Sequence, residues 1–285
     1  MLDLKKRRRR KSSPPSEARA PSLMRQFLGW CVHGYTALGL VAAAMIAVLL
    51  VRGGADAYRW SFILMVIATV VDSTDGTLAR RVRIKEAVPS FDGRRLDDLV
   101  DFLNYTCLPL LLVWRARLLP EGYDVWLLLP LIASAYGFCQ VEAKTADGFF
   151  LGFPSLWNVV ALYLYILPMG SWAALTIVVV LAILTFVPTR HLYPSQPGSL
   201  NRAATVLGLV WTVLLVWIVW DLPRGSEWRP SDSTVRLAYL SLFYPIIYLG
   251  TSWAISLMYW KKQLLGKRKL PRAAPLDAPA RLTEI

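Results

Sequence analysis

The chain has 285 residues, of which 55% are hydrophobic and 12 are Trp. Its mean hydropathy is +0.43, and its apolar share exceeds the roughly 45–50% of an ordinary soluble domain. A soluble globular protein is therefore excluded, and we expect an integral membrane protein. The net charge is +13, and basic clusters at residues 5–11 and 261–269 carry much of it. Because these clusters flank apolar segments, their expected partner is an anionic lipid surface and not nucleic acid.

Eight apolar segments are candidate membrane spans when they are compared with a hydrocarbon core about 30 Å thick. They cover residues 28–51, 60–79, 96–114, 125–143, 153–168, 172–188, 203–220 and 236–260. The fifth and sixth segments are separated only by a tight turn at residues 167–171, as expected for two adjacent antiparallel helices. The sequence predicts an all-α integral membrane protein, a bundle of about eight transmembrane helices.

The basic residues predict how this bundle is oriented. Residues 1–25 lack an apolar period and are expected to form a disordered basic tail, followed by a transmembrane catalytic domain over 26–262 and a cytoplasmic tail over 263–285. Of the 32 Lys and Arg residues, 25 fall on the side that holds both tails and the loop at 80–95, and 6 fall on the other side. The positive-inside rule then predicts that both termini and this loop are cytoplasmic.

Four carboxylates lie at the cytoplasmic ends of the second and third spans. Asp72 and Asp75 are three residues apart, and Asp97 and Asp101 are four apart, so each pair shares a helix face. Two helices joined by a short loop can bring the pairs together, and the resulting charge of about −4 requires neutralisation by protons or cations. No His or Cys is adjacent to them in the sequence, so the ligands are all oxygen, which favours Mn²⁺ or Mg²⁺. Two ions that share bridging carboxylates would balance the charge.

The neighbouring residues suggest a substrate for this metal site. Gly76 and Gly93 leave room for a ligand to approach the backbone, and Arg80 can reach a phosphate. A diphosphate with a lipid tail fits such a site at a membrane surface, where a free carboxylate can take the proton of an attacking hydroxyl. The alternative is a cation-coupled transporter, whose relay acids usually lie nearer the middle of the membrane.

These residues form a motif that resembles a known family. The pattern Asp72-x₂-Asp75-Gly76-x₂-Ala79-Arg80-x₁₂-Gly93-x₃-Asp97-x₃-Asp101 is similar to the signature of the CDP-alcohol phosphatidyltransferases. The gap of twelve residues is longer than the family's usual spacing. The resemblance implies that the first three acids are metal ligands and that Asp101 is the general base and also a ligand. It also implies a nucleotide and donor site that is lined by Gly76, Ala79, Arg80 and Gly93, with His33 and Thr36 on one face of the first span.

Longer stretches resemble the phosphatidylcholine synthase branch of this family. They are residues 32–39, 91–105, 136–163 and 186–195. The resemblance implies an enzyme of the bacterial inner membrane that condenses CDP-diacylglycerol with choline and releases CMP. A homodimer is compatible with the sequence. Serine, inositol or glycerol 3-phosphate as the acceptor is the alternative within the family.

Choline needs a particular kind of pocket, because its quaternary ammonium has no N–H to donate. Aromatic faces and a nearby carboxylate are the available contacts. Near the predicted cytoplasmic mouth, the candidates are Tyr105, Tyr136, Glu142 and Trp157. The competing interpretation is that the aromatic residues pack in the bundle and that Glu142 pairs with Lys144 at the membrane surface.

Overall fold

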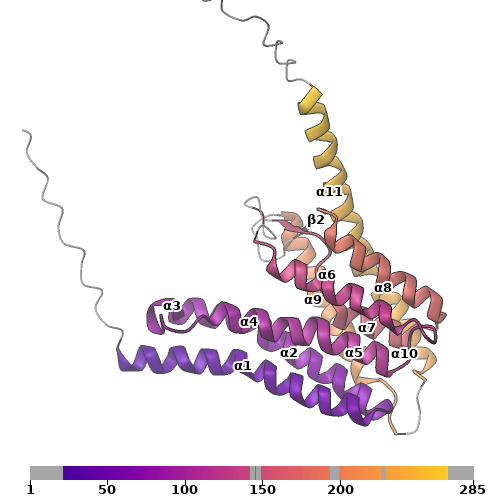
Figure 1. Cartoon of the computed structure of the whole chain (residues 1–285), viewed down its shortest axis with the longest axis horizontal. Helices are drawn as coiled ribbons and strands as arrows, with labels where there is room; N and C mark the ends of the chain where they lie inside the picture. Colours follow the sequence, from indigo (N-terminus) through magenta and orange to yellow (C-terminus); the bar gives the residue numbers. More distant parts are fainter. Residues whose placement is uncertain (1–21, 142–144, 146–148, 193–198, 226–228, 269–285) are drawn as a thin grey trace, which may run out of the picture.

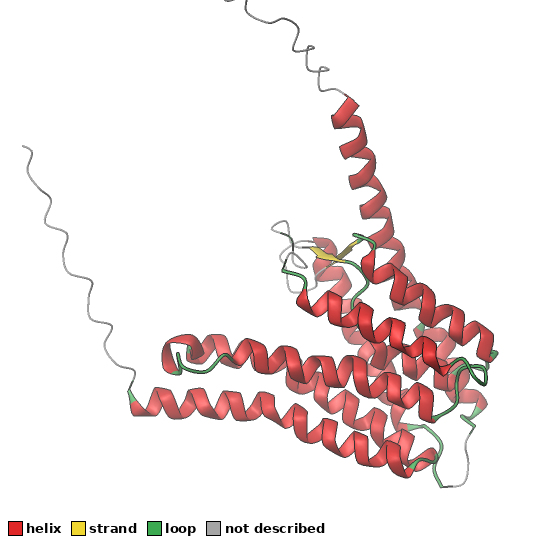
Figure 2. Cartoon of the chain, in the orientation of Figure 1, coloured by secondary structure: helices red, strands yellow, loops and turns green. Residues whose placement is uncertain are grey.

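The computed structural model describes residues 22–141, 145, 149–192, 199–225 and 229–268. Within these ranges the chain is mainly helical, as expected, with one small sheet of two short strands (Figure 2). Figure 1 shows α1, α2, α4 and α5 lying alongside one another, and the later helices packed at one end of this group.

The first two helices form an antiparallel pair. Helix α1 (Leu23–Arg52) and helix α2 (Ala55–Val82) are the most extensively contacting pair of elements. Gly53 and Gly54 reverse the chain between them with φ angles of 71° and 94°, which glycine adopts without the steric cost of a Cβ atom.

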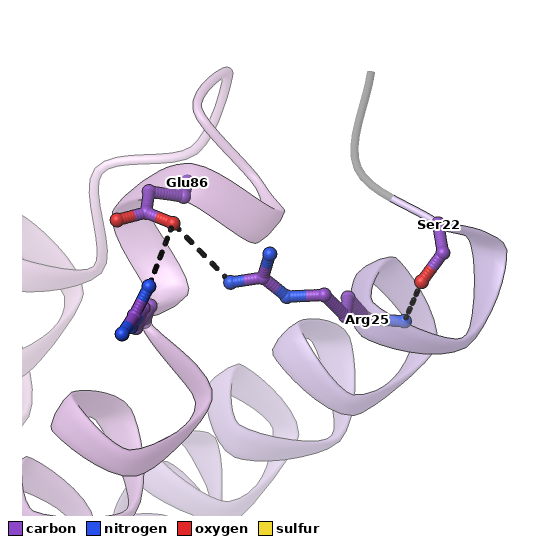
Figure 3. Close-up of polar contacts among 4 residues, drawn as sticks. Ser22, Arg25 and Glu86 are labelled. Carbon is purple, nitrogen blue, oxygen red and sulfur yellow. Dashed lines mark hydrogen bonds and ion pairs between the residues drawn. The ribbon is translucent and has the colours of Figure 1, made fainter. Parts of the chain in front are cut away.

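Polar contacts fix the predicted cytoplasmic end of this pair (Figure 3). The backbone N–H of Arg25 donates to the Ser22 hydroxyl at 3.4 Å, which caps α1. The Arg25 guanidinium also forms an ion pair of 3.2 Å with Glu86, on the single turn of α3 (Ile84–Ala87). The beginning of α1 is thus linked to the loop that connects α2 with α4.

The next three elements form one uninterrupted helical rod. It consists of α4 (Gly93–Asp101), the π-helical turn η1 (Phe102–Cys107) and α5 (Leu108–Arg115). The Asp92 carboxylate accepts the backbone N–H groups of Arg94 and Arg95 at 3.2 and 3.3 Å and so caps the rod. Helix α1 contacts α4, η1 and α5 along its length.

The remaining helices enclose most of the apolar core. They are the 3₁₀ turn η2 (Asp124–Leu127), α6 (Leu128–Cys139), α7 (Trp157–Ile166), α8 (Ser171–Phe186), α9 (Ser199–Trp220), α10 (Asp232–Ser241) and α11 (Phe243–Arg268). Helix α7 is central, with contacts to α5, α10 and α2. Its residues Trp157 and Ala161 are buried together with Leu112, Val178 and Ile218 from other helices.

A two-stranded sheet joins two loops that are distant in the sequence. Strand β1 (Phe149–Leu151) pairs antiparallel with β2 (Arg190–Leu192). The other edge of β2 lies against α11, where Ser256 and Ser252 accept the backbone N–H groups of Arg190 and Leu192 at 2.7 and 3.4 Å. Sequence patterns did not predict these strands, because three residues are too few to show an alternating period.

Every expected span coincides with a helical segment, although the lengths differ. In the described part of the chain, four segments are long and apolar enough to cross a membrane: Leu23–Arg52, Ala55–Val82, Asn201–Trp220 and Asp232–Leu264. The rod that begins with α4 is continuous but contains the π turn, and α6, α7 and α8 are shorter. Helix α7 has 10 residues, which at 1.5 Å per residue span about 15 Å, half of a bilayer core.

Candidate active site

Three carboxylates from two helices form an acidic group. Asp72 comes from α2, and Asp97 and Asp101 come from α4. Each is partly buried, and each contributes one oxygen that lies within 4.8 Å of the oxygens of the other two. The helical spacing of the acids therefore leads to the predicted convergence for three of the four.

The fourth acid, Asp75, is directed toward α1. Its side chain is buried, and its Oδ2 accepts a hydrogen bond of 2.7 Å from the Thr36 hydroxyl. Thr36 and His33 were predicted to lie on one face of the first span, and both are buried there. Thr36 thus connects α1 with the acid-bearing part of α2.

A tyrosine hydroxyl holds Asp72 in a similar way. The phenol of Tyr105 donates to Asp72 Oδ2 at 2.7 Å. Tyr105 belongs to the π-helical turn that directly follows Asp101. Such turns are rare and are often found at functional sites. The sequence predicted that Tyr105 lies near the acids, but it did not predict this hydrogen bond.

Asn104 is a polar residue of the site region that the sequence analysis missed. Its side-chain amide donates to the carbonyl of Gly39 in α1 at 3.1 Å and to the carbonyl of Val100 at 3.0 Å. The side chain is 2% exposed. An amide within an apolar run needs hydrogen-bond partners, and this requirement was the available signal. Asn104 ties the π turn to α1.

The motif residues after Asp75 are more open. A Cβ atom on Gly76 would meet only the tip of the Arg80 side chain, at 3.4 Å. Arg80 is exposed and donates to the Thr77 hydroxyl at 3.0 Å, and Ala79 is partly exposed. A ligand can therefore approach the backbone at Gly76, as the sequence predicted.

Gly93 has a close neighbour in the structure. A Cβ atom at this position would lie 2.5 Å from Cε1 of His33, so the imidazole occupies the space that a side chain would need. The ring of His33 also packs against Phe91, with 4.5 Å between centroids, and against Trp30 at 5.8 Å. His33 Nε2 is buried and has no hydrogen-bond partner within the described residues. This nitrogen can accept from, or donate to, a bound ligand.

The residues suggested for choline are dispersed in the structure. Tyr105 lies at the acidic group, whereas Tyr136 packs against Phe186 of α8 with 5.0 Å between ring centroids. Trp157 is 1% exposed, and its indole N–H donates to the Ser134 hydroxyl at 2.8 Å. Glu142 lies outside the described residues. Trp157 is thus a packed side chain, whereas Tyr136 is 45% exposed beside Phe186.

The acidic group has the chemistry of a site for a divalent cation. Three carboxylates at this distance repel one another unless protons or cations neutralise them. Within the described residues, neither His nor Cys joins the group. Oxygen ligands of this kind are those that Mg²⁺ and Mn²⁺ prefer. The residues present therefore fit such an ion.

Comparisons with known proteins agree with the motif. A sequence model of the CDP-alcohol phosphatidyltransferase family matches residues 34–188, more than half of the chain and all four acids. The chain is also similar to three bacterial proteins named phosphatidylcholine synthase. The protein from Borreliella burgdorferi is 30% identical over 223 residues, which are 78% of this chain and 94% of that protein.

The other two relatives are more similar in sequence over a shorter alignment. The protein from Legionella bozemanae is 40% identical over 197 residues, 68% of this chain and 90% of the relative. The protein from Pseudomonas aeruginosa is 38% identical over 191 residues, 66% of this chain and 79% of the relative. Together with the family match, these similarities show that the chain belongs to the CDP-alcohol phosphatidyltransferase family.

Proposed function

We propose that this membrane protein is a phosphatidylcholine synthase, which transfers the phosphatidyl group of CDP-diacylglycerol to choline and releases CMP. The observation that carries the proposal is the acidic group of Asp72, Asp97 and Asp101 at the family motif. The shared name of the relatives supports choline as the acceptor.

Asp101 is proposed as the general base, and its place in the acidic group supports this role. The choline hydroxyl gives its proton to the Asp101 carboxylate, and the hydroxyl oxygen attacks the phosphorus that bears diacylglycerol. The bond between this phosphorus and the CMP oxygen breaks, so phosphatidylcholine and CMP are the products. Asp72, Asp75 and Asp97, with Asp101 as a further ligand, would hold two divalent ions, Mn²⁺ or Mg²⁺. Such ions, when bound, stabilise the charge on the diphosphate oxygens and on the leaving CMP.

The donor nucleotide is proposed to lie along the beginning of α4 and the end of α2. The open approach at Gly76 and the exposed guanidinium of Arg80 support this placement, with Ala79 beside them. Gly93 contributes by admitting the ring of His33, whose Nε2 has no partner in the described protein. Thr36, on the same helix as His33, contributes to the proposed nucleotide site through its hydrogen bond to Asp75.

Choline is proposed to bind at the acids on the side of Tyr105, with Glu142 as the balancing carboxylate. Tyr105 is the candidate whose position supports this role, because its ring lies at the acidic group. A quaternary ammonium gains about 0.5–2 kcal/mol from each aromatic face. Tyr136 and Trp157 are further candidates for this pocket; the first contacts Phe186 and the second donates to the Ser134 hydroxyl.

We further propose eight membrane crossings with both termini in the cytoplasm and the site at the cytoplasmic side of a bacterial inner membrane. The distribution of Lys and Arg supports this orientation. The four long apolar helices support a multi-pass protein. The proposed division of the chain is a basic tail over 1–25, a catalytic domain over 26–262 and a cytoplasmic tail over 263–285.

The test is an acceptor screen with purified protein, CDP-diacylglycerol and Mn²⁺. We expect CMP release that depends on choline, with phosphatidylcholine as the lipid product. A preference for serine, inositol or glycerol 3-phosphate would assign the chain to another branch of the family. Cation uptake by vesicles that hold the protein, without a requirement for CDP-lipid, would favour the transporter instead.

A further inference from the structure

Both motif acids of α2, Asp72 and Asp75, accept a hydrogen bond from a hydroxyl on a neighbouring element. Thr36 of α1 donates to Asp75, and Tyr105 of η1 donates to Asp72, each at 2.7 Å. Of the two acids, Asp72 belongs to the acidic group. The Tyr105 hydroxyl therefore acts directly on one of the oxygen ligands available to a cation.

The phenol is held in place by its surroundings. Tyr105 is 8% exposed, and the adjacent Asn104 anchors the same turn to the carbonyl of Gly39. A hydrogen bond from this fixed phenol limits rotation of the Asp72 carboxylate. It also satisfies one lone pair of Oδ2. Partners of this kind orient metal ligands, and their loss typically costs 10- to 100-fold in metal affinity or activity.

From this geometry we infer that Tyr105 is a positioning residue for the divalent cation, acting through Asp72. The inference rests on the proposed function insofar as the acidic group binds a cation. It assigns to the Tyr105 hydroxyl a role separate from any contact that the ring makes with choline. The two roles can be tested separately, since Tyr105→Phe removes the hydroxyl and keeps the aromatic face.

The experiment measures Mn²⁺ binding to the purified full-length chain in detergent, from the electron paramagnetic resonance signal of free Mn²⁺. We expect Tyr105→Phe to weaken binding by about 10- to 100-fold. In kinetic assays the Mn²⁺ concentration for half-maximal rate should rise by a similar factor. At saturating Mn²⁺ the choline KM should stay within about twofold of that of the unmodified protein, because the ring remains.

Tyr163→Phe is the matched control. It also removes a buried phenolic hydroxyl, which forms hydrogen bonds with Ser241 at 2.8 Å and with the Trp211 indole at 3.0 Å. Tyr163 lies in α7, which carries none of the motif acids. We expect the Mn²⁺ affinity of Tyr163→Phe to stay within about twofold of that of the unmodified protein. Its thermal midpoint can fall, because a buried hydrogen bond is lost.

A second comparison tests whether the hydroxyl acts through Asp72. Asp72→Ala with Tyr105→Phe is compared with Asp72→Ala alone, in which the acceptor has already been removed. Equal Mn²⁺ affinity of the two supports the inference, and a further tenfold loss in the double variant overturns it, because the tyrosine then acts without Asp72.

The remaining outcomes separate this inference from the proposed function. Normal Mn²⁺ affinity in folded Tyr105→Phe overturns the positioning role and leaves the synthase proposal intact. A raised choline KM with normal Mn²⁺ affinity also overturns it and assigns the hydroxyl to the acceptor. Absence of Mn²⁺ binding in the unmodified chain, with Mg²⁺ also failing to bind, refutes the metal site itself.

Discussion

The Asp101 carboxylate lies where α4 ends and the π turn begins, within the acidic group. Asp101→Asn preserves its shape and much of its coordination, but the amide cannot accept the proton of choline. We expect turnover to fall by about 10²-fold or more, the usual scale for loss of a general base, with donor binding largely retained. The measurement is CMP release at saturating substrates beside equilibrium binding of CDP-diacylglycerol. A near-normal rate would remove Asp101 from this role, whereas Asp97→Asn is expected to weaken metal and donor binding together.

The contact between Gly93 and His33 gives a second prediction for single residues. Gly93→Ala places a methyl group 2.5 Å from the imidazole, and such overpacking typically costs about 1–3 kcal/mol. We expect a lower thermal midpoint in detergent. Adding His33→Ala should recover part of the loss, because the second change removes the clashing ring. Additive destabilisation by the two changes would contradict this account of why the position is glycine.

The acids could be predicted from the sequence because helical spacing and the cost of charge in a membrane are local properties. Their partners could not. Whether Tyr105 reaches Asp72 or choline depends on the register between α2 and the rod that contains η1, which no pattern along one segment encodes. For the same reason, Trp157 was indistinguishable in sequence from an aromatic ligand contact, although it is buried against Ser134.

Close packing of α1 against α4 depends on a small residue. A Cβ atom on Gly39 would lie 2.3 Å from Cγ1 of Val100. We expect Gly39→Ala to push the helices apart, to lower the thermal midpoint by the equivalent of about 1–3 kcal/mol, and to reduce activity, because α4 carries Asp97 and Asp101.

Gly34→Ala is the matched control on the same helix, since a Cβ atom there has nothing within 4 Å. Relief from the low helix propensity of glycine should leave stability unchanged or raise it by up to about 1 kcal/mol. Equal losses from both substitutions would mean that the contact with Val100 is not the cause. Recovery in Gly39→Ala with Val100→Ala would support it.

Hydropathy located every apolar helix but could not give their lengths. The expected span over 153–168 contains only the 10 residues of α7 as helix, because its buried position shields irregular flanking backbone from lipid. The π turn was also not predictable, since a single extra residue in a helical turn leaves the apolar pattern nearly unchanged. Strand β2 depends on contacts with β1 and α11 that are distant in sequence.

At the scale of the whole molecule, an even number of crossings requires both ends on the same side. A reporter that is active only in the cytoplasm, fused after Ile285, should therefore be active, and one inserted in the loop between α1 and α2 should be inactive. An inactive carboxyl-terminal reporter would indicate an odd number of crossings. The short helix α7 would then be the first segment to reconsider.

The hydrogen bonds between β2 and α11 have a consequence for folding during synthesis. The Ser256 and Ser252 hydroxyls that accept from the strand follow their partners by 66 and 60 residues. A growing chain thus makes all four motif acids, and the helices that bear them, long before it makes the groups that fix the two-stranded sheet. Synthesis that stops before α11 yields a chain with its acidic group present and with the backbone N–H groups of Arg190 and Leu192 left without these acceptors. Helix α11, the last helix of the described residues, is thus the one that holds β2, and through it β1, in position.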